Sequence, residues 1–230
     1  MSPAEVDDFL RSRDALRITA RLEELVSDQR RERIDHVLRG RHKRLVVALE
    51  EPYDPHNAAA VVRSAEAFGA GAVHVISASE RILRAKRTTT GTHRWVRTRS
   101  HRTLAGALKA LRAEGMTIAG ACVDGTCELE SLPVDRPLCL LFGNENRGLS
   151  ESAKSACDLR YRIPMHGFAE SLNLSVSAAI SLYVTLGRRR EHLGRDSDLE
   201  PDEIARERAR WYLNSVDGRT IQALAERGEL

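Results

Sequence analysis

Short apolar runs alternate with amphipathic stretches through the middle of the chain, and this alternation limits the fold more than any other feature. Each run is only a few residues long, as in RLVVALE at 44–50 and RPLCLLFG at 136–143, which is typical of a buried strand. Strands that alternate with helices form parallel sheets with helices on both faces. We therefore expect an α/β fold with a mostly parallel sheet across residues 44–190.

The expected elements follow one another in a regular order. A helix at 57–69 follows the first strand, with Asn57 as its N-terminal cap and Gly69 at its end. The other predicted strands lie at 72–77, 116–123 and 159–165, and the other predicted helices at 101–115, 150–157 (capped by Ser150) and 174–190. Residues 1–43 and 191–230 are charged with helical periodicity, so we interpret them as helical extensions of the 44–190 domain.

The distribution of charge is more informative than the formal net charge of +3. From Arg81 to Arg102 there are eight Lys or Arg residues and no Asp or Glu. Such a run favours contact with a polyanion, although a solvated surface is the alternative. Aromatic residues make up only 4% of the chain, which argues against recognition dominated by base stacking.

Several classes of site and location are disfavoured by the sequence. The four cysteines form no CxxC pair, which argues against a zinc or thioredoxin-like site. We expect no metal ion. The first residues do not resemble a signal peptide, and no segment approaches the ~20 apolar residues of a membrane helix. We expect a cytoplasmic protein with no membrane partner.

The segment LLFGNENRGLS at 140–150 places a polar loop directly after an apolar strand. Its glycines have the spacing of a P-loop, but the Lys–Ser/Thr that would hold phosphate and magnesium is missing. The chain also lacks a GxGxxG after its first strand and a GxSxG elbow. Gly143 and Gly148 suit either a tight turn or a ligand that approaches the main chain closely.

A second polar segment, MHGFAESLNLSVSAA at 165–179, crowds Ser171, Asn173 and Ser175 at the start of a helix. One cap needs one such side chain, so we expect Ser171 and Asn173 to be surplus to capping and to have another role. The polar loops after 44–50, 136–142 and 159–165 all follow strands. Because the carboxyl ends of parallel strands share one edge of a sheet, we expect these loops to converge there.

Three segments in order resemble the three motifs of the SpoU/TrmH branch of the SPOUT RNA 2′-O-methyltransferases: NAAAVVRSAEAFG (57–69), LLFGNENRGLS (140–150) and IPMHGFAESLNLSVSAAISLY (163–183). The resemblance implies a deep trefoil knot in the C-terminal part of the sheet domain. It also implies S-adenosylmethionine as methyl donor and a homodimer whose active site is completed across the interface. TTTGTHRW at 88–95 and the charged ends are similar to members that methylate guanosine 18 in the D-loop of tRNA.

The resemblance assigns roles to single residues. The catalytic positions that it implies are Arg63, Glu145, Ser171 and Asn173, with Asn57 supporting its own loop. The positions implied to contact the cofactor are Gly143, Ile163 and Leu172, with Ala121 as a further candidate. Basic residues expected to contact tRNA phosphates are Arg84, Lys86, Arg87, Arg94, Arg11 and Arg13, with Arg188–Arg190 as further candidates.

Two chemical roles remain open. A ribose hydroxyl is a weak nucleophile and needs either a base or stabilisation of the developing alkoxide. Arg63 could be that base, or it could clamp a phosphate and stabilise the oxyanion, because the guanidinium pKa above ~12 leaves little neutral form. Glu145 could favour the positively charged sulfonium reactant, or it could orient Asn173 and Arg63.

Two other functions compete with tRNA methylation. One is 2′-O-methylation of ribosomal RNA, which belongs to the same class of enzyme. The other is RNA binding without catalysis on the same fold. The presence of Arg63, Glu145, Ser171 and Asn173 together argues against a non-catalytic protein.

Overall fold

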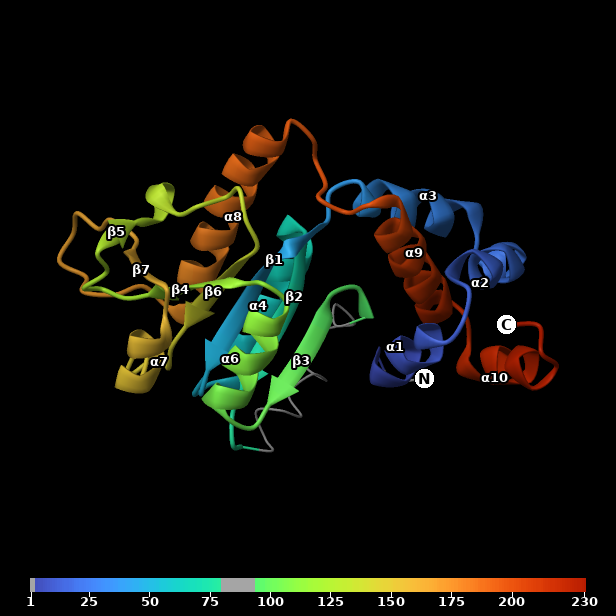
Figure 1. Ribbon diagram of the computed structural model, residues 1–230, viewed down its shortest axis with the longest axis horizontal. Coiled ribbons are helices and arrows are strands. Elements are labelled where there is room, and N and C mark those ends of the chain that lie inside the picture. The colour runs from blue at the N-terminus through green and yellow to red at the C-terminus, as the bar shows by residue number, and fades with distance from the viewer. Residues whose placement is uncertain (1–2, 80–93) are drawn as a thin grey trace. The chain divides into compact units, whose positions relative to one another are not determined.

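The structure is a computed structural model that describes residues 3–79 and 94–230 (Figure 1). By its internal packing the chain divides into two compact units. We call residues 42–196 the sheet unit, and residues 1–41 together with residues 197–230 the helical unit. The two ends of the chain therefore belong to one unit.

The sheet unit is built on a seven-stranded sheet in the order β3-β2-β1-β6-β4-β7-β5. Its strands are β1 (His42–Glu50), β2 (Ala70–Ile76), β3 (Arg97–His101), β4 (Thr117–Ala121), β5 (Cys127–Glu128), β6 (Leu138–Phe142) and β7 (Leu159–Arg162). Every paired strand runs parallel to its neighbour, which confirms the predicted α/β class with a parallel sheet. The knot implied by the family resemblance stays a prediction.

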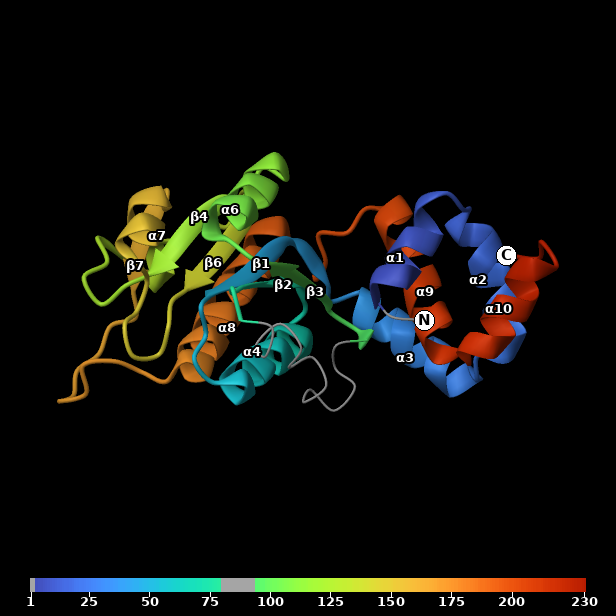
Figure 2. The same cartoon turned by 90° about the horizontal axis from the view of Figure 1, so that it is seen from below.

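Helices cover both faces of this sheet, as Figure 2 shows. They are α4 (Pro55–Phe68) and α8 (Leu174–Leu193) on one face, and α6 (Leu104–Ala113) and α7 (Glu151–Ala156) on the other, with a short 3-10 helix η4 (Leu129–Ser131) before β6. Along β1, Val47 is buried in the same cluster as α4 and α8, whereas Val46 and Ala48 are buried with α6. Because both faces are covered, the strands read as continuous apolar runs and do not alternate with polar residues.

Several predicted boundaries were wrong. The side chain of Asp54, and not that of Asn57, caps α4 by accepting the His56 N–H at 2.8 Å. Pro55 then occupies the first turn, where its missing N–H is no loss. The predicted helix at 101–115 begins only at Leu104, since residues 97–101 form the edge strand β3. The predictions for Gly69 at the end of α4 and Ser150 as the cap of α7 are confirmed.

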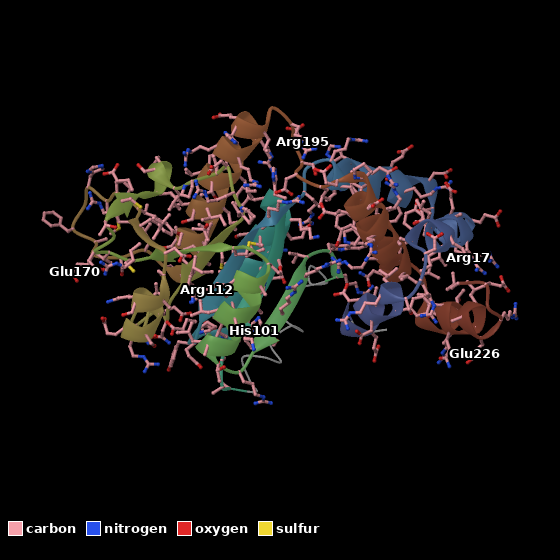
Figure 3. The ribbon with its side chains drawn as sticks, viewed as in Figure 1. Arg17, His101, Arg112, Glu170, Arg195 and Glu226 are labelled. Atoms are coloured by element: carbon pink, nitrogen blue, oxygen red, sulfur yellow. The ribbon has the colours of Figure 1, made fainter. Side chains whose placement is uncertain are left out.

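The helical unit joins the first helices of the chain to the last ones. It contains α1 (Pro3–Arg11), α2 (Ala15–Leu22), the 3-10 helix η1 (Glu23–Leu25), α3 (Asp28–Leu38), α9 (Pro201–Ser215) and α10 (Gly218–Glu226). α9 packs against α1, α2 and α3, with Trp211 buried. Arg17, labelled in Figure 3, donates to the Gly228 carbonyl oxygen at 2.8 Å, and Arg21 donates to the Glu229 carboxylate at 2.8 Å. No helix within the described residues is long and apolar enough to cross a membrane.

Candidate active site

A cavity of about 450 Å³ lies at the carboxyl edge of the sheet. Its walls come from the ends of β4, β6 and β7 and from the loops that follow them, which is where open parallel sheets bind ligands. The inner wall includes the buried side chains of Phe142, Tyr161 and Leu174. Exposed polar residues, including Arg147 and Glu170, line the same cavity nearer to solvent. The cavity is therefore apolar inside and charged at its rim.

The loop after β6 is a closed turn. The Asn144 N–H donates to the Gly148 carbonyl at 3.0 Å, and the Gly148 N–H donates back to the Asn144 carbonyl at 2.8 Å. A Cβ atom on Gly143 would lie 2.1 Å from the carbonyl carbon of Gly148, and Gly148 itself has a φ of +67°. No side chain fits at the first position, and the second favours glycine. Both glycines are therefore required by the tight turn.

Asn144 holds this turn against the loop that follows β1. Its side-chain N–H donates to the Glu51 carbonyl at 2.7 Å, while its side-chain oxygen accepts the Asn146 N–H at 2.9 Å. Asn144 is only 8% exposed. Our sequence reasoning missed this residue because the contact with Glu51 spans 93 positions and leaves no local pattern.

One hydrogen-bonded network joins a residue from each of the three motifs. The Glu145 carboxylate accepts the Tyr53 N–H at 2.7 Å and the side-chain N–H of Asn57 at 2.9 Å. The side-chain oxygen of Asn57 in turn accepts an N–H from Asn173 at 3.3 Å. The predicted convergence of the loops after β1, β6 and β7 is thereby confirmed.

The Glu145 carboxylate is held in its ionised form. Burial by itself would raise its pKa, but hydrogen bonds from the Tyr53 N–H, the Asn57 side chain and the Asp54 N–H together bring the pKa below its ordinary value. An ionised carboxylate that accepts from three donors is a strong anchor. Glu145 therefore fixes the loop after β6 against the start of α4.

Asn173 has a structural role that the sequence interpretation did not assign to it. Its side-chain oxygen caps α8 by accepting the Ser175 N–H at 2.8 Å, and it also accepts the Ser175 hydroxyl at 2.7 Å. The prediction that Asn173 is surplus to capping was therefore wrong. Ser171 is exposed, lines the cavity and has no hydrogen-bond partner within residues 3–79 and 94–230.

Of the remaining predicted site residues, some line the cavity and one does not. All four residues predicted to contact the cofactor line the cavity: Gly143, Ile163, Leu172 and Ala121. Arg63 lies on α4, is exposed and is not among the cavity-lining residues. Its side chain has neither a hydrogen bond nor an ion pair with the described part of the chain.

The residues predicted to contact RNA differ in whether the structure describes them and in whether they already contact another side chain. Arg84, Lys86 and Arg87 lie outside the described residues. Arg94 is exposed. In the helical unit, Arg11 pairs with Asp8 at 3.0 Å, and the Arg13 guanidinium lies 3.9 Å from the centre of the Phe9 ring.

The three arginines near the end of α8 are used inside the sheet unit. Arg188 donates to the Leu132 carbonyl at 2.8 Å, and Arg190 donates to the Phe68 carbonyl at 2.9 Å. Arg189 is 3% exposed and donates to the Val134 carbonyl at 2.7 Å. A buried guanidinium cannot reach a nucleic acid, so the suggestion of an RNA contact was wrong for Arg189.

Comparison with known proteins identifies the family. The sequence pattern of the SpoU rRNA Methylase family matches residues 44–183, a range that includes all three motifs. The chain belongs to the SpoU methylase family. This result confirms the resemblance stated from the sequence, and the matched range lies within the sheet unit of this SpoU methylase.

Curated relatives of this SpoU methylase are similar over most of their length. The chain is 32% identical over 174 residues to the tRNA (guanosine(18)-2′-O)-methyltransferase of Escherichia coli, covering 74% of this chain and 76% of that protein. It is 35% identical over 158 residues to the enzyme of the same name from Thermus thermophilus, covering 68% of this chain and 81% of that protein.

Solved structures are similar in fold as well. The A. aeolicus TrmH/SpoU tRNA modifying enzyme matches with a TM-score of 0.72 and 29% identity, over 83% of this chain and 98% of that one. The SpoU methyltransferase AviRb from Streptomyces viridochromogenes, solved in complex with the cofactor AdoMet, matches with a TM-score of 0.58 and 29% identity, over 64% of this chain and 60% of that one.

Proposed function

We propose that this SpoU methylase transfers a methyl group from S-adenosylmethionine to a ribose 2′-hydroxyl of tRNA, and that the target is guanosine 18 of the D-loop. The observation that carries the proposal is the Glu145–Asn57–Asn173 network beside the cavity, which joins the three family motifs at one edge of the sheet. The choice of tRNA is supported by the named relatives, whose similarity extends over most of each protein. Ribosomal RNA remains the competing substrate.

The cavity residues fit S-adenosylmethionine. Buried Phe142 and Leu174, with half-buried Ile163 and Leu172, offer apolar surface to an adenine ring. Gly143 and Gly148, which have no side chains, also line the cavity, so polar atoms of the adenosine can approach the main chain there. When bound, S-adenosylmethionine would supply a methyl group on a sulfonium: an oxygen nucleophile would attack the methyl carbon in line, and the neutral thioether S-adenosylhomocysteine would leave.

The protein must place and activate the ribose hydroxyl. We assign this task to Arg63, which either takes the hydroxyl proton or stabilises the developing alkoxide while it holds the adjacent phosphate. Glu145 acts through Asn57 on Asn173, since its carboxylate already accepts hydrogen bonds and stays ionised. Of the two roles considered for Glu145, orientation of Asn173 is therefore favoured. Ser171, which has no partner in the described chain, is left to contact the substrate.

We also propose that a second copy of the chain completes the site. Unlike Glu145 and Ser171, Arg63 does not line the cavity of its own chain, and we infer that the partner protomer brings this residue to the ribose. An apolar stripe on α8 offers a contact surface: Val176 is 45% exposed, and Tyr183, further along the same helix, is 69% exposed. The Tyr183 ring leans edge-on against Phe68 of α4, with 5.9 Å between ring centres. The stripe therefore lies next to the helix that carries Arg63.

The activity is tested with purified protein, radiolabelled S-adenosylmethionine and unmodified tRNA transcripts. We expect label in tRNA, mapped by nuclease digestion to the ribose of guanosine 18, and none when position 18 is changed to another nucleotide. Ribosomal RNA of the same organism is the parallel substrate. Label only in ribosomal RNA would replace the tRNA assignment, and RNA binding without any label would refute the methyltransferase assignment.

The shared site is tested by mixing two inactive variants. Arg63→Ala protomers and Asn173→Ala protomers should each be inactive alone. If Arg63 acts on the partner's cavity, mixed dimers contain one site with both residues intact, and a fraction of the activity returns. Light scattering should give a dimer for the wild type and a monomer for Tyr183→Glu. No recovery in verified mixed dimers would place Arg63 and Asn173 in the same chain's site.

A further inference from the structure

The positively charged residues that line the cavity differ in whether they have a partner. Lys154 pairs with Glu151 at 2.9 Å, and Arg162 lies 3.5 Å from the Glu128 carboxylate. Arg147 also lines the cavity, yet its guanidinium makes no ion pair or hydrogen bond within residues 3–79 and 94–230. Among these three cations, Arg147 alone is left available to a ligand.

The carboxylates of the cavity lining show the same division. Asp124 lies 3.7 Å from the Arg160 guanidinium, and Glu145 accepts the hydrogen bonds described above. Glu170 is exposed, lines the cavity and has no partner in the described chain. Figure 3 shows it on the loop that leads from β7 towards α8. Within the described part of the chain, Arg147 and Glu170 are thus an unpaired positive charge and an unpaired negative charge on the cavity rim.

Arg147 is carried on an ordered piece of backbone. Its N–H donates to the side-chain oxygen of Asn144 at 3.3 Å, within the turn that the Asn144 and Gly148 main chains close. A guanidinium on a turn of fixed geometry loses less freedom on binding than one on a flexible loop. The position of Arg147 is therefore suited to a ligand that binds in the adjoining cavity.

We infer that Arg147 and Glu170 bind the amino-acid end of S-adenosylmethionine, with the guanidinium on its α-carboxylate and the Glu170 carboxylate on its α-ammonium. The inference rests on the proposed function, because it takes the methyl donor as the ligand of this cavity. Guanidinium–carboxylate pairs are strong because two N–H groups can meet two oxygens. The apolar inner wall then contacts the adenosine, and the charged rim contacts the zwitterion.

A phosphodiester of the RNA is the other anion that Arg147 could bind. The presence of Glu170 on the same rim argues against it, because a carboxylate repels a phosphate but attracts an ammonium group. A zwitterion satisfies both unpaired charges, whereas a phosphate satisfies one and repels the other. The charge pattern of the rim therefore favours the amino-acid end of the methyl donor.

The test compares three adenosine ligands by calorimetry, without any methyl transfer. S-adenosylhomocysteine has both charged groups, its decarboxylated form (S-adenosyl-3-thiopropylamine) keeps the ammonium only, and methylthioadenosine has neither group; all three are neutral at sulfur. We expect Arg147→Ala to lower the affinity for S-adenosylhomocysteine about tenfold and to change the affinities for the other two ligands less than about twofold. Glu170→Gln should lower the affinities for both ammonium-bearing ligands about fivefold and leave the affinity for methylthioadenosine unchanged.

The matched control is Lys154→Ala, which removes a paired cation from the same cavity lining. It should change the affinity for S-adenosylhomocysteine less than about twofold. Unchanged methylthioadenosine binding shows that a variant has kept its fold. The inference would be overturned if a variant lost affinity equally for all three ligands. It would also be overturned if Arg147→Ala lost affinity for tRNA while its affinity for S-adenosylhomocysteine stayed the same. Wild-type protein that binds none of the three ligands would refute the proposed methyl donor itself, and the inference with it.

Discussion

The polar residues that the family motifs supply form two groups that differ in whether they have hydrogen-bond partners. Glu145, Asn57 and Asn173 have hydrogen-bond partners inside the chain. Arg63 and Ser171 have none within the described residues. Both groups come from the same three motifs, so membership of a motif does not by itself say what a residue does.

The difference separates residues that stabilise the fold from residues that are available for the reaction. A side chain that is already hydrogen-bonded stabilises the loops in the absence of a ligand, and its removal leaves its partners unsatisfied. A side chain without a partner adds little to folding and is available to a substrate. We therefore expect variants of the first group to lose stability and activity together, and variants of the second group to lose activity alone.

The largest effect is expected at Arg63. Arg63→Ala should lower the rate of methyl transfer by about 10²–10³-fold, because it removes the group that activates the hydroxyl or stabilises its oxyanion. The melting temperature should not change, since Arg63 has no partner in the described chain. Single-turnover assays and thermal unfolding of the same preparation measure the two quantities.

The Arg63→Lys variant then separates the two roles of this residue. A simple charge clamp should keep part of the activity, whereas a two-pronged contact or a positioned base should not. A drop in melting temperature for either variant would contradict the grouping, because it would mean that Arg63 supports the fold.

Glu145 should show the opposite combination. Glu145→Ala leaves the Tyr53 N–H and the Asn57 side chain without their acceptor, which should lower the free energy of unfolding by about 2 kcal/mol. Activity should fall as well, because Asn57 and Asn173 are no longer oriented. Denaturant unfolding and methyl transfer are measured side by side. Full stability with lost activity would move Glu145 into the group that contacts the substrate.

The division between the two groups could not be predicted from the sequence. The motifs and the strands that carry them are local patterns, because strands covered on both faces are continuous apolar runs such as the one in β1. Partners are not local: Glu145 meets Asn57 across 88 positions, and Asn173 meets Asn57 across 116. Apart from the local cap that Asn173 forms with the Ser175 N–H, no pattern within a few residues distinguishes them from Ser171 or Arg63.

Other misses have physical causes of their own. Strand β3 has the sequence RTRSH, and it escaped notice because an edge strand needs no apolar residues to be paired on one side. β5 is only two residues long. The cap of α4 is visible in the sequence, because Asp54 followed by Pro55 is a typical helix start, and Asn57 three residues later is a competing residue of the same capping class.

Acid unfolding sharpens the comparison, because it contrasts ionised Glu145 with a buried neutral group. His74 is fully buried, with its Nδ1 atom 3.0 Å from His101 Nε2. Burial lowers its pKa to about 3, helped by the positive charge of Arg99 and by His101. Between the unfolded pKa of 6.5 and the folded pKa of about 3, the unfolded chain binds the proton and the folded chain does not. The stability of the fold therefore decreases as the pH is lowered through this window.

We expect this one histidine to lower the stability by about 2 kcal/mol between pH 6.5 and pH 5. Glu145 does not contribute in that window: its folded pKa is lowered from 4.5, so its stabilising effect is complete above that value and is lost only as the pH falls through the lower, folded pKa. Denaturant unfolding at several pH values should give a flatter profile for His74→Asn than for Glu145→Gln. Equal slopes for both variants and the wild type would show that His74 does not control the acid sensitivity.

The smallest effect is expected at Asn173, whose side-chain oxygen and side-chain N–H have different partners. The side-chain oxygen of Asn173 caps α8, while its N–H donates to Asn57. Asn173→Ala removes both contacts and should cost about 1 kcal/mol of stability, as for other lost caps. Asn173→Asp keeps an oxygen at the cap, where the helix dipole favours a negative charge, but cannot donate to Asn57. It should therefore unfold like the wild type and still lose activity, whereas Ser171→Ala should leave stability unchanged. If Asn173→Asp were as active as the wild type, capping would be the whole contribution of Asn173, and the network would end at Asn57.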